Sequence, residues 1–132
     1  MKKQNPDHIG TNKTPPVKMW PIQLKLSPIY APYFNTDELL IAGSCTAFAH
    51  GSFREFTEGK TCLICCDKVN TFDAERLSKI LLRNDVRSVR VIRMDVPCCG
   101  GLAMSVRKAI ELSGKDIPID VDVVTTNGEV NC

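Results

Sequence analysis

The stretch that decides the fold reads VRVIRMDVPCCGG (residues 89–101). Its first eight residues are mostly apolar, which is typical of a strand buried on both faces of a parallel sheet. Pro97 cannot donate to a β-ladder and ends the strand, and Cys98 and Cys99 follow it directly. Gly100 and Gly101 supply freedom for positive φ angles and close backbone approach. We therefore expect the chain to turn here and to bring both thiols to one site.

Similar apolar runs lie on either side of this stretch, at residues 39–43, 61–65 and 121–124. Helical patterns separate them, at residues 46–56 (the weakest), 71–83 (capped by Asn70 or Thr71) and 102–112 (closed by Gly114). The order strand–helix–strand, repeated, predicts an α/β fold. We expect a small three-layer domain with a mainly parallel four-stranded sheet and right-handed helical crossovers.

The N-terminal part differs in character from the rest. Residues 1–18 are polar, contain three prolines and show no periodicity, so they are predicted to form a flexible tail before a single α/β cysteine-site domain over residues 19–132. Residues 22–26 alternate apolar and polar positions, and the prolines around them suit the edge of a sheet. We expect an N-terminal edge arm here, held on the domain by Trp20 and Tyr33.

Composition excludes several classes of function. Aromatic residues make up 6% of the 132 residues, the net charge is +2 and the basic residues are dispersed, so a nucleic-acid partner is not expected. The sequence has no apolar run long enough to span a membrane and no apolar segment of a signal peptide, which indicates a cytoplasmic protein. In a reducing compartment, seven cysteines favour thiol or metal chemistry over disulfides.

Four of the cysteines come directly after predicted strands: Cys45, Cys66, Cys98 and Cys99. The carboxyl ends of parallel strands share one edge of the sheet, where ligands bind, so these thiols are predicted to converge. Backbone N–H groups at the start of the helix at residue 102, together with Lys68, would compensate thiolate charge. Four thiolates suit an iron–sulfur cluster, and equally zinc, whereas magnesium and calcium are excluded by ligand softness.

Other candidate residues are given structural interpretations. Cys62 and Cys65 lie within one strand, should face opposite sides of the sheet and are predicted to be core residues. Cys132 ends the chain and is interpreted as a loose thiol. His50 is expected to have a surface or capping role rather than to bind a ligand. Arg90 and Arg93 should face opposite sides of the third strand, and they are expected on a solvated edge or in a helix-covering role.

Several motifs together resemble a known family. They are WPIQL (residues 20–24), APYF (31–34), AFA (47–49) after Cys45, and PCCGG (97–101). In combination they resemble the C-terminal domain of the bacterial and archaeal 4Fe–4S binding ferredoxin-like proteins, over about residues 20–118. Members usually carry an N-terminal ferredoxin module with two cluster-binding cysteine motifs, a pattern that residues 1–132 do not show. The family's Cys-Pro-Lys with a following acidic pair is CDKVN (66–70) in this chain, and its Ala-Asp-Cys is GSC (43–45).

The resemblance implies an iron–sulfur context, with a 4Fe–4S cluster as the cofactor and a ferredoxin as a possible redox partner. The sequence thus favours an iron–sulfur protein, or another thiolate-bound metal protein, that serves electron transfer or redox chemistry with a partner protein. The first alternative is a thiol-redox or sulfur-transfer enzyme with a cysteine nucleophile near the start of the helix at residue 102. The second is a zinc-stabilised interaction module.

Overall fold

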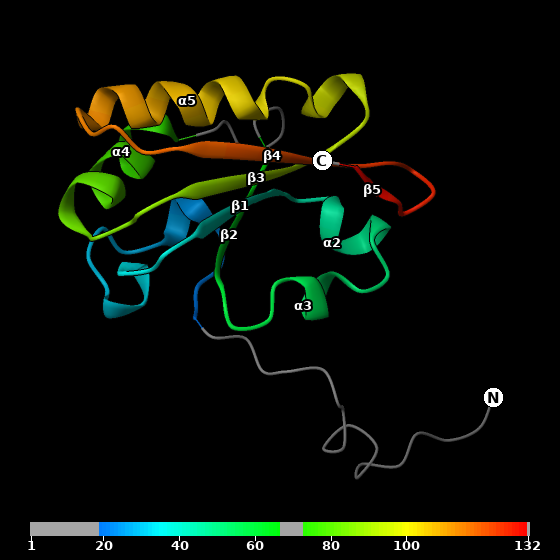
Figure 1. The fold of residues 1–132 in the computed structure, drawn as a ribbon, viewed down its shortest axis with the longest axis horizontal. Helices are drawn as coiled ribbons and strands as arrows, with labels where there is room; N and C mark the ends of the chain where they lie inside the picture. The colour runs from blue at the N-terminus through cyan, green and yellow to red at the C-terminus, as the bar shows by residue number, and fades with distance from the viewer. Residues whose placement is uncertain (1–18, 67–72, 132) are drawn as a thin grey trace, which may run out of the picture.

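A computed structural model describes residues 19–66 and 73–131, and within these ranges the side chain of Cys98 is outside the description. The predicted tail and the predicted caps Asn70 and Thr71 also lie outside the described residues. The described chain forms one five-stranded sheet between two layers of helices (Figure 1). The α/β fold with three layers is therefore confirmed.

The strands follow the order β2-β1-β3-β4-β5 across the sheet. Their bounds are β1 Leu39–Gly43, β2 Thr61–Cys65, β3 Val89–Met94, β4 Ile119–Val124 and β5 Val130–Asn131. The first four are parallel, and β5 pairs antiparallel with β4. The sheet thus has one strand more than predicted, because β5 is only two residues long and has no periodicity to detect.

Two longer helices cover one face of the sheet and two single-turn helices cover the other (Figure 1). Their bounds are α2 Thr46–Ala49, α3 Phe53–Phe56, α4 Ala74–Arg83 and α5 Leu102–Ser113. The Asp73 carboxylate caps α4 by accepting a hydrogen bond from the Arg76 N–H at 2.9 Å. Gly114 closes α5 in the left-handed conformation that the sequence predicted, with φ of 75°. None of these described helices is both long and apolar enough to span a membrane.

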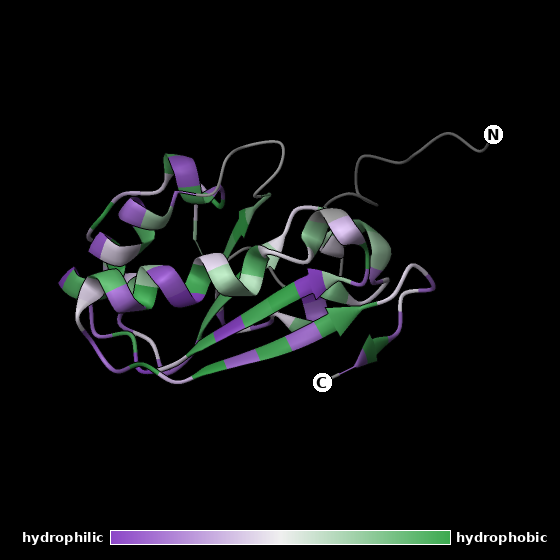
Figure 2. Ribbon diagram, turned by 90° about the horizontal axis from the view of Figure 1, so that it is seen from above, coloured by the Kyte–Doolittle hydropathy of each residue, from purple (hydrophilic) through white to green (hydrophobic). Residues whose placement is uncertain are grey.

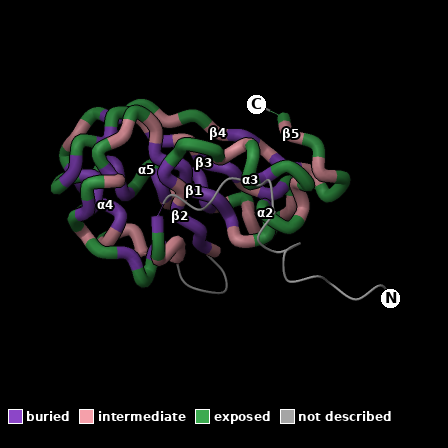
Figure 3. The backbone as a smooth tube through the Cα atoms, turned by 90° about the horizontal axis from the view of Figure 1, so that it is seen from below, coloured by how far each residue is buried: buried purple, intermediate pink, exposed green. Residues whose placement is uncertain are grey.

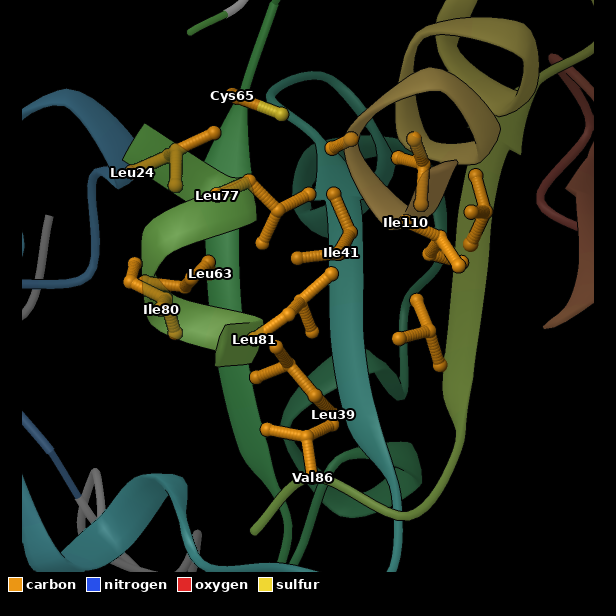
Figure 4. Close-up of a cluster of buried hydrophobic side chains, with 14 of the residues drawn as sticks. Leu24, Leu39, Ile41, Leu63, Cys65, Leu77, Ile80, Leu81, Val86 and Ile110 are labelled. Atoms are coloured by element: carbon orange, nitrogen blue, oxygen red, sulfur yellow. The ribbon is translucent and has the colours of Figure 1, made fainter. Parts of the chain in front are cut away.

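Each face of the sheet has its own core. The larger one lies under α4 and α5, whose hydrophobic and hydrophilic residues alternate along the helices (Figure 2), and it includes Leu39, Ile41, Leu63, Leu77 and Val106. A close-up of it shows how side chains from α4 and β1 meet (Figure 4). The smaller core lies under α2 and α3 and includes Leu40, Phe53 and Ile92. As a result the central strands are almost entirely buried (Figure 3).

The N-terminal arm runs along β2, but it is not the strand that alternation predicted. It makes a single parallel bridge, between Gln23 and Ile64, and then forms a 3-10 helix over Leu24–Leu26. This turn buries Leu24 in the larger core at 1% exposure and leaves Leu26 68% exposed, whereas an extended strand would place both on the same face. Trp20 is 71% exposed, so its predicted anchoring role is wrong. Tyr33 does pack against the larger core.

Candidate functional site

The cavity of interest lies at the carboxyl edge of the sheet, around the end of β1. From β1 the chain crosses to β2 on one side, and then returns past β1 to β3 on the other side. Such a reversal in strand order leaves a crevice beyond the strand ends. Here the crevice is a cavity of about 220 Å³, lined by residues that end or follow β1, β2 and β3.

Three of the four predicted thiols line this cavity: Cys45 after β1, Cys66 after β2 and Cys99 after β3. Cys45 is exposed at the rim, whereas Cys66 and Cys99 are partly buried. The fourth predicted ligand, Cys98, lies in the same turn as Cys99, but its side chain is outside the description. Lys68, predicted to compensate charge, lies outside the described residues. Strand topology therefore brings together side chains that are 21 and 33 positions apart in the sequence.

The Cys99 thiol sits directly against the end of β1. A Cβ atom added to Gly43 would lie only 2.9 Å from Cys99 Sγ, so this approach depends on glycine. The Met94 N–H donates a hydrogen bond to the same sulfur at 3.2 Å. A donor aimed at sulfur stabilises the charged thiolate more than the neutral thiol. The surroundings of Cys99 thus suit a ligand or a nucleophile.

Gly100 and Gly101 do not play the part that the sequence suggested. Their φ angles are −66° and −87°, which any residue adopts, so the expected positive φ is wrong. The turn is instead a 3-10 helix over Pro97–Cys99, in which the Gly100 N–H donates to the Pro97 carbonyl at 3.2 Å. The glycine that permits close approach is Gly43, which sequence reasoning missed because it reads as the last residue of an apolar strand.

The loop that carries Cys45 is held by a local hydrogen bond. The buried Thr46 hydroxyl donates to the Gly43 carbonyl at 2.7 Å. The Cys45 carbonyl accepts from the N–H groups of Phe48 at 3.2 Å and Ala49 at 3.0 Å, so Cys45 begins the single turn of α2. These contacts fix the backbone at the point where the Cys45 thiol reaches the rim of the cavity.

Two cysteines of β2 face opposite sides of the sheet, as predicted. Cys62 packs against the smaller core, where burial raises the pKa of its thiol to about 12. Cys65 belongs to the larger core at 4% exposure, and Figure 4 shows its sulfur pointing from β2 toward β1. Cys65 also lines the cavity. The interpretation as core is therefore incomplete, since the last residue of a buried strand can border both the core and the site.

Ser44 is the most unusual polar residue of the site. Its N–H donates to the Cys65 carbonyl at 2.9 Å, which fixes the backbone between β1 and β2. Ser44 is one of the residues that line the cavity, and among the described residues Ser44 Oγ is the single buried side-chain N or O atom without a hydrogen-bond partner. A buried hydroxyl without a partner is costly, so this atom marks a place where an acceptor belongs.

The remaining candidate residues lie elsewhere. The His50 Nδ1 donates to the Gly128 carbonyl at 3.1 Å, and the His50 N–H donates to the Thr46 carbonyl at the end of α2, in keeping with the predicted capping role. Arg90 pairs with Glu38 at 3.2 Å and with the buried Asp122 at 2.9 Å. Because Arg90 pairs in register with Leu40, near the start of β1, this network lies toward the edge opposite the cavity.

The described thiols line a cavity and are not gathered around the position of a single ion. Across the described side chains, no group of three or more His, Cys, Asp or Glu is arranged to hold a single metal ion. The thiols that line the cavity, Cys45, Cys65, Cys66 and Cys99, come from the ends of three strands. This arrangement can enclose a group of several atoms, or it can present a thiolate to a substrate.

Comparison with known proteins shows the family to which this chain belongs. A family model described as a Rossmann-like domain matches residues 31–131, which is more than half of the chain. An uncharacterized protein of Archaeoglobus fulgidus is 30% identical over 118 residues, covering 86% of this chain and 82% of that protein. No solved structure matches the chain. The matched region includes all five strands and the cavity, and the chain belongs to the Rossmann-like domain family.

Proposed function

We propose that the cavity at the carboxyl edge binds an iron–sulfur cluster through cysteine thiolates, and that the protein exchanges electrons with a partner protein. The observation that carries the proposal is that Cys45, Cys66 and Cys99, from three different strand ends, line one cavity. Cys98 is the predicted fourth ligand, from the same turn as Cys99. When bound, such a cluster accepts and returns single electrons.

The size and lining of the cavity suit a group of several atoms. A volume of about 220 Å³ is several times the roughly 30 Å³ share of a water molecule in the liquid. A lone zinc ion would need its sulfur ligands within about 2.3 Å of one point. A cavity of this volume has room for more than one ion, which supports a polynuclear cluster over the zinc-stabilised module.

The polar atoms around the cavity fit an anionic, sulfur-rich group. The Met94 N–H already donates to Cys99 Sγ at 3.2 Å, and Ser44 Oγ is buried without a partner among the described residues. Hydrogen bonds to the sulfurs of a cluster stabilise it and set its reduction potential. Gly43 leaves the space in which Cys99 stands. The thiol ligands, the space left by Gly43 and the hydrogen-bond donors near the cavity therefore all fit an iron–sulfur cluster.

The sequence motifs add support for iron. The combination of residues 20–24, 31–34, 47–49 and 97–101 resembles the C-terminal domain of 4Fe–4S binding ferredoxin-like proteins. A ferredoxin is the partner that this resemblance suggests. Cys45 is exposed at the rim of the cavity, and the neighbouring Phe48 is 95% exposed, so the cluster would lie close to a surface with an apolar contact point.

Anaerobic purification with iron, zinc and acid-labile sulfide analysis tests the proposal. We expect a brown protein with iron and sulfide in equal amounts. Cys66→Ser should lose most of the iron, whereas Cys62→Ser should retain it, because Cys62 packs against the smaller core and does not line the cavity. Equal iron in the two variants would contradict the assignment of the site.

The other outcomes point to the two alternatives. A colourless protein with stoichiometric zinc would favour the interaction module. A metal-free protein with one rapidly alkylated thiol would favour a thiol-redox or sulfur-transfer enzyme, with Cys99 as the nucleophile because of its hydrogen bond from Met94 N–H. Either result would reject the cluster.

A further inference from the structure

One hydroxyl beside the cavity has no hydrogen-bond partner among the described residues. Ser44 is one of the residues that line the cavity, and its Oγ is buried without a partner. Two positions later the Thr46 hydroxyl donates to the Gly43 carbonyl at 2.7 Å. The same short loop therefore satisfies one buried hydroxyl and leaves its neighbour without an acceptor.

The position of Ser44 is well fixed. Its N–H is bonded to the Cys65 carbonyl at 2.9 Å. Gly43, just before it, ends β1 in register with Cys65, and Cys45, just after it, begins α2. The hydroxyl thus lies between two hydrogen-bonded elements, beside a cavity whose other lining side chains carry only carbon and sulfur. Those lining side chains therefore offer Ser44 no oxygen or nitrogen acceptor.

We infer that Ser44 donates its hydroxyl hydrogen bond to a sulfur atom of the group that occupies the cavity. This inference rests on the proposed function. Sulfurs of a cluster and its thiolate ligands carry negative charge, and a hydrogen bond from a hydroxyl to a charged acceptor is stronger than one between neutral groups. Ser44 is therefore a positioning residue, which orients the bound group and tunes its electronic state without being a ligand.

The inference has one consequence for the reduction potential of the loaded protein and another for the stability of the metal-free protein. A donor near the cluster stabilises the reduced, more negative state, so its removal should make the reduction potential more negative. In the metal-free protein the hydroxyl is a buried group without a partner, so its removal should leave the stability unchanged or raise it. A residue with a purely structural role would lower the stability of the metal-free form when truncated.

The test compares Ser44→Ala, Ser44→Thr and Ser52→Ala in the full chain. Ser52 is an exposed serine at the start of α3 whose side chain makes no capping hydrogen bond, which makes it a matched control. We expect a more negative cluster potential for Ser44→Ala, a potential near that of the wild type for Ser44→Thr, and no shift for Ser52→Ala. Urea unfolding of metal-free Ser44→Ala should occur at the same or a higher urea concentration than in the wild type.

An unchanged potential in a fully loaded Ser44→Ala protein would overturn the inference. So would a metal-free Ser44→Ala protein that unfolds at a lower urea concentration than the wild type, since the hydroxyl would then already have a partner. The second measurement remains valid if the variant does not retain iron. Failure of the wild type itself to bind iron and sulfide would instead reject the proposed function.

Discussion

Gly43 determines how closely the Cys99 thiol can approach the end of β1. A Cβ at this position would lie 2.9 Å from Cys99 Sγ, a distance at which one of the two groups must move. Gly43→Ala should therefore displace the thiol and weaken iron binding by roughly 10- to 100-fold, as is typical when the support of a metal ligand is altered. Competition with an iron chelator measures the change.

Gly51→Ala is the control for this prediction, because a Cβ at Gly51 would have no atom within 4 Å. Iron retention equal to that of the wild type in both variants would show that Cys99 does not depend on Gly43 for its position. Loss of iron in both would point to a general loss of stability instead.

Cys62 and Cys45 should differ sharply in reactivity in the metal-free protein. Burial raises the pKa of the Cys62 thiol to about 12, so at pH 8 roughly one molecule in 10⁴ carries the reactive thiolate. Cys45 is exposed at the rim of the cavity. Iodoacetamide labelling followed by peptide mass spectrometry should find Cys45 modified early and Cys62 last. Early modification of Cys62 would contradict its placement in the smaller core.

The sequence predicted which cysteines follow strands, because an apolar run and its end are visible in one chain. It did not predict the roles of Gly43, Ser44 and Cys65. Gly43 and Cys65 look like ordinary strand residues until the register places them opposite each other and the turn at Cys99 lies above them. The missing partner of Ser44 is a three-dimensional fact, and no local pattern reports it.

The start of α4 depends on Asp73, whose carboxylate accepts the Arg76 N–H at 2.9 Å and lies 3.4 Å from Arg76 Nε. Asp73→Ala should lower the free energy of unfolding by about 1 kcal/mol, the typical effect of losing such a cap. Urea denaturation of the metal-free protein measures it. Asp85→Ala is the control, since its ion pair with Arg87 is largely exposed and should contribute little. Equal losses would argue against the cap.

Periodicity predicted the longer strands and helices well, and failed where tertiary contacts decide. Strands over residues 39–43 and 61–65 and the helix from residue 102 have the predicted bounds to within one residue. The arm at residues 22–26 alternates like a strand, yet it makes one bridge to β2 and then forms a 3-10 helix that buries Leu24 and leaves Leu26 exposed. The two-residue β5 is a strand only through its antiparallel pairing with β4.

The two edges of the sheet carry different kinds of residue. Thiols and the cavity occupy the carboxyl edge, whereas charged residues tie the strands together toward the amino edge. There Glu38, just before β1, pairs with Arg90 of β3, and Arg90 also pairs with Asp122 of β4. This separation predicts that acid below about pH 4 should weaken the fold through groups that are remote from the site.

Glu38 carries the clearest pH effect. Burial alone would raise the pKa of its carboxyl group, but the hydrogen bond and charge of Lys60, at 3.0 Å, together with the charge of Arg90, outweigh burial and lower it. A carboxyl group whose pKa is lower in the folded than in the unfolded protein stabilises the fold above its unfolded pKa, about 4.3 for Glu. This contribution is lost as the pH falls from there through the folded pKa.

Glu38→Gln should therefore lower the stability of the metal-free protein at pH 7 and have a much smaller effect near pH 3, where the wild-type carboxyl group is becoming protonated. Urea unfolding curves at both pH values measure the difference. Glu58→Gln serves as the control, because Glu58 is exposed. If Glu38→Gln were as destabilising near pH 3 as at pH 7, the loss would come from packing of the side chain rather than its charge, and Lys60 and Arg90 would not hold the amino edge through Glu38.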